Sequence, residues 1–241
     1  MANDTITPEE EFHLTLLTAE LKRKVRDGTL EGVELILLQL EDMTGTARDK
    51  PLLIAEKKRR WFEHWYSALG FEITVPLPPV ADEEFVSRVA EEQMLCYRPP
   101  SVRVDYKDFM RKIGQGENWT VKNNYAPEVT ENGYWFWADS AETCPRRNQT
   151  WLAIMTDIPD KENNQLISLE EYVIVWQAHK TLTGGDAFDQ TSQTHLRTKW
   201  DNRPLTVDTR DQLLHTINYA GNWMIFKKDT VGGRAVEILA S

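Results

Sequence analysis

Cysteine is nearly absent from this sequence, which has only Cys96 and Cys144 among 241 residues. Two thiols are too few for a disulfide framework or for a cysteine-rich zinc site. Long apolar runs are missing as well, and no stretch approaches the roughly 20 residues of a membrane-spanning helix. The first residues are polar and acidic, which is not typical of a secretory signal. We therefore expect a reduced, cytoplasmic protein without membrane contacts.

An excess of positive charge is also missing. The chain has 28 Lys and Arg residues against 38 Asp and Glu residues, for a formal net charge of −10. A general nucleic-acid binder needs a concentrated basic face, so we expect no nucleic-acid partner. The single basic run, Lys57 to Arg60, lies in a predicted helix and spreads around its circumference. We interpret this run as a solvated face.

The common catalytic motifs are missing too. There is no glycine-rich phosphate loop, no nucleophile elbow and no His-Glu-x-x-His sequence. We therefore assign no catalytic residue, metal ligand or cofactor. Cys144 precedes Arg146 and Arg147, whose charge could stabilise a thiolate, but a structural thiol is the favoured interpretation. Glu170 and Glu171 are neighbours on a predicted helix and face apart, so they predict no acid–base pair.

The N-terminal part is rich in helical periodicity. Apolar residues at spacings of three and four predict helices over residues 7–28, 30–45 and 51–69. The third helix places Trp61, Phe62 and Trp65 on one side. Residues 71–75 alternate like a strand and lead into the stiff Pro76–Pro79 connector. We predict a helical unit over residues 1–75 and a second domain over residues 76–241.

The middle of the chain mixes helices and strands. A helix is predicted from Asp82 to Met94, with Val89 buried, and another from Asp105 to Ile113. Gly133–Ala138 contains four consecutive aromatic residues, which predict a central strand covered on both faces. The alternative for these rings is a stacking platform for a sugar or a base. Ile154 and Met155 predict the start of another short strand.

The C-terminal part begins with a capping box at Ser168–Glu171, which predicts a helix that ends before Gly184. Alternation then predicts a strand at 214–219, although a helix over 209–218 is the competing interpretation. The remaining expected elements are a turn at 220–222, a strand at 223–226, a turn at 229–233 and a strand at 234–239. The overall prediction is an α+β fold with short antiparallel strands.

From Gly133 onward the order of features resembles that of a group of bacterial proteins with a C-type-lectin-like domain, some of them targets of diversity-generating retroelements. The resemblance lies in the aromatic strand with its Cys144-Pro-Arg146 turn, the helix after Ser168, and the Arg234-Ala-Val236 ending. It implies a rigid scaffold that displays side chains to a ligand. The calcium-binding Glu-Pro-Asn loop of sugar-binding members is missing here.

Transferred to this chain, the resemblance implies a binding face between residues 200 and 223. Its expected members are Trp200, Asp201, Asn202, Arg203, His215, Asn218, Tyr219, Asn222 and Trp223. The cluster at 200–203 combines an aromatic ring with a carboxylate, an amide and a guanidinium, which suits binding. The alternative is a simple turn at 201–202 with the Trp200 ring in the core.

The leading hypothesis is a non-enzymatic protein that binds an unknown protein or small ligand. One alternative is an enzyme that uses a histidine and an aspartate in the C-terminal loops. Its candidate residues are His195, His215, Asp201, Asp208 and Asp211. A second alternative is a structural or assembly protein that forms a homo-oligomer through its N-terminal helices.

Overall fold

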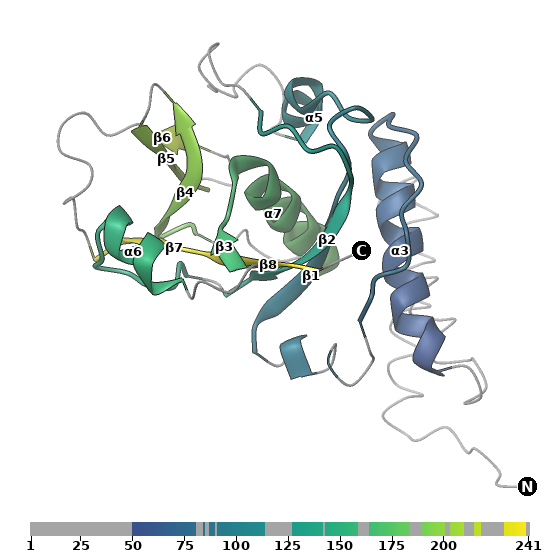
Figure 1. Cartoon of the computed structure of the whole chain (residues 1–241), viewed down its shortest axis with the longest axis horizontal. Coiled ribbons are helices and arrows are strands. Elements are labelled where there is room, and N and C mark those ends of the chain that lie inside the picture. The colour runs from purple at the N-terminus through teal and green to yellow at the C-terminus, as the bar shows by residue number, and fades with distance from the viewer. Residues whose placement is uncertain are drawn as a thin grey trace, which may run out of the picture.

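A computed structural model describes residues 50–80, 84, 87–89, 91–113, 127–141, 143–158, 164–183, 189–200, 203–209, 215–217 and 229–239. Its helices are α3 (Lys50–Ala68), α5 (Tyr106–Ile113), α6 (Trp151–Asp157) and α7 (Leu169–Thr183). Its strands are β1 (Gln93–Arg98), β2 (Tyr134–Asp139), β3 (Asn164–Leu166), β4 (Gln193–Trp200), β5 (Arg203–Asp208), β6 (His215–Ile217), β7 (Val231–Gly233) and β8 (Ala235–Ile238). The described chain is therefore α+β, as predicted (Figure 1).

The first sheet has the strand order β1-β2-β8-β3 and is antiparallel throughout. Its aromatic strand β2 lies between β1 and β8, which confirms the central position predicted from the sequence. Trp135, Phe136 and Trp137 are all buried. The aromatic strand is thus part of the core and not an exposed stacking platform.

The second sheet has the order β6-β5-β4-β7, and the chain enters it after α7 and leaves it before β8. β7 pairs with β4 in parallel, whereas β4, β5 and β6 pair antiparallel. Gly232 permits a close approach of β7 to the turn after Cys144, because a Cβ atom there would lie 2.1 Å from the Pro145 carbonyl oxygen. A residue with a side chain would push the two segments apart.

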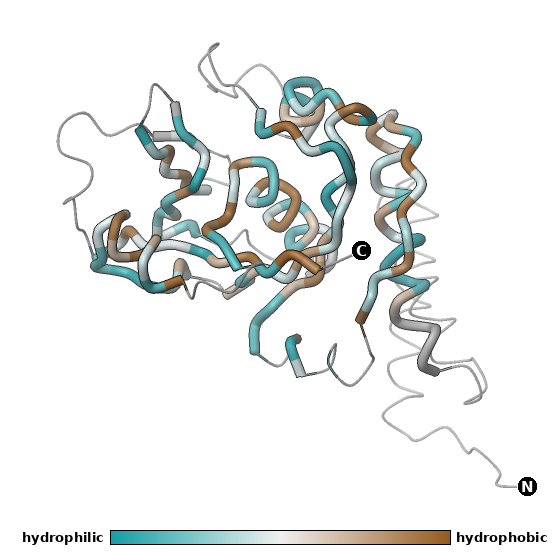
Figure 2. The backbone as a smooth tube through the Cα atoms, viewed as in Figure 1, coloured by the Kyte–Doolittle hydropathy of each residue, from teal (hydrophilic) through white to brown (hydrophobic). Residues whose placement is uncertain are grey.

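Helix α7 lies at the centre of the molecule, between the two sheets (Figure 1). The capping box that predicts its start is present: the Glu171 amide donates to Ser168 Oγ at 3.2 Å, and the Ser168 amide donates to Glu171 Oε2 at 2.8 Å. Every residue from Leu169 to Trp176 is buried. Figure 2 shows hydrophobic residues along this helix. This is expected for a helical segment that is buried on all sides, because such a segment does not need an exposed polar face.

Helix α3 packs an aromatic face against the first sheet. Trp61, Phe62 and Tyr66 are buried, and the ring centroids of Phe62 and Trp135 are 5.5 Å apart in an edge-to-face arrangement. This confirms the inward face predicted for the third helix. Figure 1 shows α3 on one side of the molecule and strands β4, β5 and β6 on the opposite side. The predicted helices at 7–28 and 30–45 lie outside the described residues, and the boundary at residue 75 stays a prediction.

Two predictions in the segment after α3 are wrong. Residues 71–75 are extended but pair with no strand, because the Val75 amide donates to Glu63 Oε1 on α3. The helix predicted from Asp82 to Met94 is shorter: only Glu84 and residues 87–89 are helical among those described, and β1 begins at Gln93. Val89 is 50% exposed rather than buried.

Two further predictions for the second half are wrong, and two strands were missed. Ile154 and Met155 belong to helix α6, not to a strand. Residues 231–233 form strand β7 and not part of a turn, since β4 offers them a parallel partner. Strands β4 and β5 were not predicted at all. The predicted strand at 214–219 is confirmed for residues 215–217, while the turn and strand at 220–226 lie outside the described residues.

Candidate functional site

Two positions of the predicted face, Trp200 and Arg203, lie at one end of a β-hairpin. Strands β4 and β5 pair from Thr194↔Val207 to Trp200↔Arg203, with a register shift between His195 and Lys199. Arg203 is therefore the first residue of β5 and Trp200 the last of β4. Asp201, Asn202, Asn218, Tyr219, Asn222 and Trp223 lie outside the described residues, as does Asp211.

The structure does not bring Arg203 and His215 together. His215 pairs with Asp208 at the far end of β5, whereas Arg203 begins that strand. Five residue steps of about 3.4 Å separate the two ends, so the two positions lie roughly 17 Å apart. Strand β6 runs antiparallel to β5 and thus leads from the His215 end back toward the Arg203 end.

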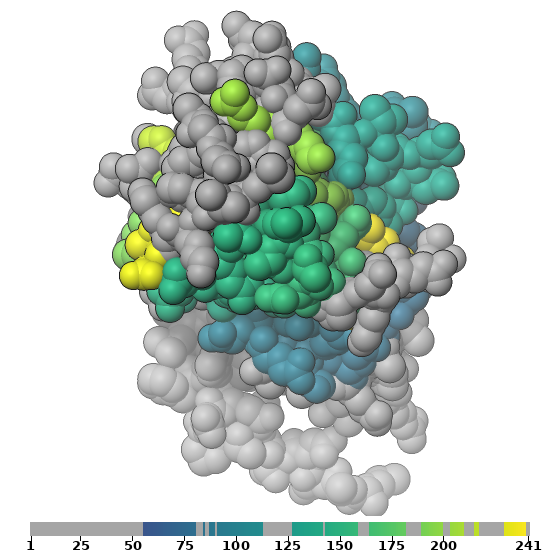
Figure 3. Space-filling view, turned by 60° about the vertical axis from the view of Figure 1, so that its left-hand side comes forward, coloured from purple at the N-terminus to yellow at the C-terminus, as the bar shows by residue number. Residues whose placement is uncertain are grey.

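Helix α6 supplies a neighbour of Lys199 that the sequence did not predict. The Lys199 ammonium lies 5.7 Å from the centroid of the Trp151 ring, at the start of α6. Leu152 and Met155 on the same helix are 56% and 39% exposed. Figure 3, viewed from this side, shows the α6 region on the open surface. Among the described residues, no carboxylate forms an ion pair with Lys199 or Arg203.

We call Trp151, Leu152, Met155, Lys199 and Arg203 the hairpin-end surface. Thr150 positions α6 by accepting a hydrogen bond from the Ala153 amide at 3.1 Å, as an N-cap residue does. Ile154 is buried, and Trp151 Nε1 donates to the Leu196 carbonyl at 3.2 Å. The N-cap at Thr150 was the sequence signal that could have identified this helix.

A buried ion-pair network fixes β4 to the start of α7. Arg197 donates to both carboxylate oxygens of Glu171, at 2.7 and 2.8 Å, and to both oxygens of Glu128, at 3.2 and 2.8 Å. Glu171 is fully buried. Burial alone would raise the pKa of Glu171, but Arg197 and Arg98 more than offset this effect and hold it below its usual range. Glu171 therefore stays ionised inside the protein.

Arg98 extends this network to the first sheet. Its guanidinium is fully buried and donates to Glu128 Oε2 at 2.7 Å and to the Tyr134 hydroxyl at 3.0 Å. The Tyr134 hydroxyl in turn donates to Glu171 Oε1 at 2.7 Å. Glu170 and Glu171 both belong to this cluster, since Glu170 Oε1 accepts from the Glu128 amide at 2.7 Å. The two carboxylates bind different partners within this cluster, and no hydrogen bond between them is formed among the described residues.

A second buried network joins β4 to the approach to β8. Asp189 accepts from Arg234 Nη2 at 2.7 Å and from Arg234 Nε at 3.0 Å, and both residues are fully buried. The hydroxyls of Tyr172 on α7 and Thr194 on β4 also donate to Asp189, at 2.9 and 2.6 Å. One carboxylate thus holds α7, β4 and the start of β8 in a fixed arrangement.

Cys144 lies beside this second network as a structural thiol. It is buried, and its sulfur lies 3.0 Å from Thr194 Oγ1. Burial raises the pKa of the Cys144 thiol to about 12, so the thiol is protonated at neutral pH. Arg146 does not activate it, because its guanidinium pairs with Asp139 at 3.1 Å. The thiolate interpretation is therefore excluded by the surroundings of the sulfur.

The histidine–aspartate pairs of the enzyme hypothesis are not formed among the described residues. His195 Nδ1 lies 3.0 Å from the Thr206 hydroxyl, and its Nε2 has no hydrogen-bond partner. Asp208 accepts from Gln193 Nε2 at 3.0 Å. His195 is 2% exposed, which leaves it inaccessible to a substrate. The described part of the chain thus gives no support to acid–base catalysis at His195.

Buried His195 predicts a specific pH dependence of stability. Burial lowers the pKa of His195 from 6.5 to about 4. The unfolded state then binds more protons than the folded state below pH 6.5, so stability decreases as pH falls from 6.5 toward 4. At 1.36 kcal/mol per pKa unit the loss reaches about 3 kcal/mol. We expect urea unfolding of His195→Asn to lack this component, and equal pH slopes in the two proteins would contradict an uncharged, buried His195.

In comparisons with known proteins, no family model, no curated protein and no solved structure matches the chain. Within the described ranges, no helix is both long and apolar enough to cross a bilayer. The same ranges contain no cluster of three metal-ligating side chains. The proposed function therefore rests on the geometry of the site.

Proposed function

We propose that this protein is a non-enzymatic binding protein with a C-type-lectin-like scaffold, and that its ligand contacts the hairpin-end surface and the adjoining residues between 200 and 223. The observation that carries the proposal is a pair of cations, Lys199 and Arg203, that have no carboxylate partner among the described residues. The Trp151 ring lies 5.7 Å from the Lys199 ammonium, and Leu152 and Met155 on the same helix are exposed. The scaffold part of the proposal rests on the resemblance of the sequence features from Gly133 onward, and the coarser α+β arrangement of β2, α7 and β8 is compatible with it.

The rigid attachment of the hairpin supports a display function. Arg197, three residues before Trp200, is fixed to α7 through Glu171, and Thr194 is fixed through Asp189. Holding a binding surface rigidly reduces the entropy lost when a ligand binds. The side chains at the hairpin end make none of these contacts, so they can vary without loss of the scaffold.

The chemistry of the hairpin-end surface favours an acidic peptide segment as the ligand. Two cations beside apolar side chains match a segment that carries both carboxylates and apolar residues, since charge complementarity selects the partner and apolar burial adds affinity. The chain as a whole has a net charge of −10, so this local positive charge contrasts with the rest of the molecule. No contact among the described residues favours the enzymatic or the assembly role.

A peptide array tests the proposal with the double variant Lys199→Glu/Arg203→Glu. We expect the wild-type protein to bind a subset of acidic peptides that contain apolar residues, and the double variant to bind them at least about tenfold more weakly. Both proteins should have the same melting temperature, because neither replaced side chain belongs to the buried networks. The control Lys107→Glu/Arg111→Glu makes the same change in charge on α5 and should retain binding.

Two results would contradict the proposal. The first is wild-type binding that the Lys199→Glu/Arg203→Glu variant retains. The second is an equal loss in the α5 control, which would assign the binding to net charge rather than to the hairpin end. Weaker binding accompanied by a lower melting temperature would show that Lys199 and Arg203 stabilise the fold rather than contact the ligand.

A further inference from the structure

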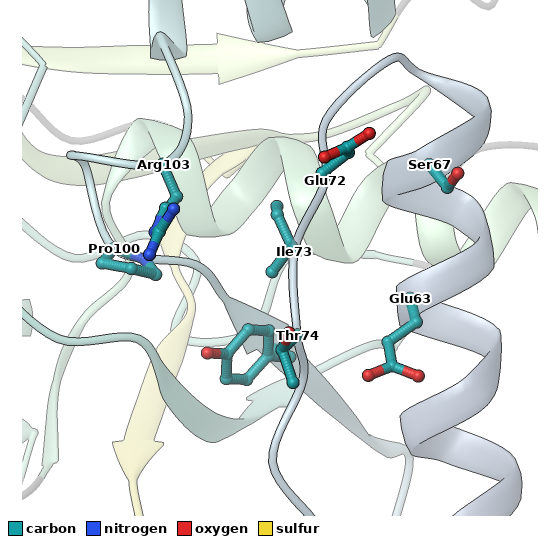
Figure 4. A pocket seen from close by; sticks show the side chains of 8 residues that line it. Glu63, Ser67, Glu72, Ile73, Thr74, Pro100 and Arg103 are labelled. Atoms are coloured by element: carbon teal, nitrogen blue, oxygen red, sulfur yellow. The ribbon is translucent and has the colours of Figure 1, made fainter.

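A cleft of about 650 Å³ lies on the α3 side of the molecule, away from the hairpin end. Its walls come from three separate segments. Figure 4 shows Glu63 and Ser67 on α3, Glu72 and Thr74 on the extended segment that follows α3, and Arg103 on the loop after β1. Arg103 lies on one side of the extended segment and Glu63 lies on the other. The cleft therefore presents opposite charges across its width.

The charges in this cleft are not satisfied by one another. Arg103 and Glu72 form no ion pair and no side-chain hydrogen bond with the residues that the structure describes. By contrast, Arg59, Arg88 and Arg98 each pair with a carboxylate. A guanidinium and a carboxylate that share a cleft without pairing are complementary to a ligand that carries both charges.

Tyr97 also lines the cleft and is 4% exposed. Its hydroxyl forms no hydrogen bond with the described residues, and its oxygen is reached by solvent. The hydroxyl lies so close to Gly133 that a Cβ atom there would be 2.1 Å from the oxygen. The hydroxyl can therefore donate a hydrogen bond to a ligand in the cleft.

The extended segment contributes unpaired backbone groups as well. Residues 72–74 form no backbone hydrogen bond within the described protein, whereas both ends of the segment are fixed. At one end the Phe71 amide donates to the Tyr66 carbonyl at 2.9 Å, and at the other the Val75 amide donates to Glu63. Three peptide units are thus held in place and remain open to hydrogen bonding by a peptide-like ligand.

We propose that this cleft binds a short peptide with free termini. The terminal carboxylate pairs with Arg103, and the terminal ammonium lies beside Glu72, since Glu63 already pairs with Arg59 at 2.7 Å. The peptide groups bond to the backbone of residues 72–74 and to the Tyr97 hydroxyl. Carboxylates prefer the forked donors of a guanidinium, which is why Arg103 determines the orientation. The site is independent of the hairpin-end surface, so either proposal can fail without the other.

Amide NMR titration with the dipeptide Ala-Ala tests this inference on the full chain. We expect saturable shifts of the amide signals of residues 72–74, 97 and 103, with a Kd on the order of 1 mM. N-acetyl-Ala-Ala and Ala-Ala-amide each lose one terminal charge and should bind about tenfold more weakly. Arg103→Gln should weaken binding of Ala-Ala by a similar factor and should no longer distinguish Ala-Ala from Ala-Ala-amide.

The matched control is Arg111→Gln on α5, since this exposed arginine already pairs with Asp108. It should leave the affinity unchanged. Glu72→Gln provides a second test that does not depend on Arg103. This variant should selectively reduce the difference in affinity between Ala-Ala and N-acetyl-Ala-Ala. No saturable shift at residues 72–74, equal binding of the three probes, or equal losses in Arg103→Gln and Arg111→Gln would overturn the proposal.

Discussion

Replacing Arg234 with methionine is expected to lower the free energy of unfolding by about 3–5 kcal/mol, because it leaves the Asp189 carboxylate buried without its counter-charge. Both side chains are fully buried, and Arg234 makes two hydrogen bonds to Asp189. Its other contacts are the Asp139 and Ala141 carbonyls, at 3.2 and 2.9 Å. Urea unfolding monitored by tryptophan fluorescence measures the loss.

A matched comparison separates this effect from that of an ordinary ion pair. Arg146 pairs with Asp139 at 3.1 Å, but 28% of its side chain is exposed, so Arg146→Gln should lower stability by about 1 kcal/mol or less. Adding Asp189→Asn to Arg234→Met should recover part of the loss, because no unpaired charge then remains. Equal losses of unfolding free energy in Arg234→Met and Arg146→Gln would show that the buried Arg234–Asp189 pair stabilises the fold no more than the exposed Arg146–Asp139 pair does.

Replacing Arg197 with methionine is expected to lower the free energy of unfolding by a similar amount, about 3–5 kcal/mol. Glu171 is fully buried and would lose both hydrogen bonds from Arg197, and Glu128 would lose two more. The remaining partners of the Glu171 carboxylate are the Tyr134 hydroxyl, the Ser168 amide and, at 3.8 Å, the Arg98 guanidinium. Among the described residues, Arg98 would then be the one remaining cation of the network for both Glu171 and Glu128. Denaturant unfolding at neutral pH measures the change.

The control for Arg197 is a second arginine on the same hairpin. Arg203 has no carboxylate partner among the described residues, so Arg203→Met should change stability by less than about 0.5 kcal/mol. Arg197→Met should therefore disturb the fold and Arg203→Met only the surface. A large loss from Arg203→Met would place its side chain in the scaffold and would also weaken the proposed binding function.

Elements whose signals are local were predicted from the sequence. The capping box at Ser168 and Glu171 identifies the start of α7, since the donors and acceptors lie within three residues of each other. Asp105 does the same for α5, where its side chain accepts from the Lys107 amide at 2.9 Å. The aromatic run in β2 is apolar enough to indicate a central strand without knowledge of its partners.

Strands β4 and β5 could not be predicted because their polar side chains are satisfied by distant residues. Thr194 bonds to Asp189 and Cys144, and Arg197 bonds to Glu171 and Glu128. A strand of this composition resembles a solvent-exposed loop until its partners are known. The converse error occurred at residues 71–75, where the alternation is real but no strand lies alongside.

The candidate site was predicted only in part for the same reason. Arg203 lies at the hairpin end as a binding face requires, but His215 lies at the opposite end of β5. Trp151 and Lys199 meet only because α6 packs on β4 through the Trp151–Leu196 hydrogen bond. Sequence alone does not reveal which segments distant in the chain become adjacent.

The position of β8 between β2 and β3 determines when the first sheet can form during folding. Phe136 in β2 pairs with Ile238, a partner about 100 residues further along the chain, and closing such a long loop is slow. Until β8 arrives, one edge of the aromatic strand has no partner and is open to other chains. Refolding at high protein concentration should therefore favour aggregation through β2 before the native sheet is complete.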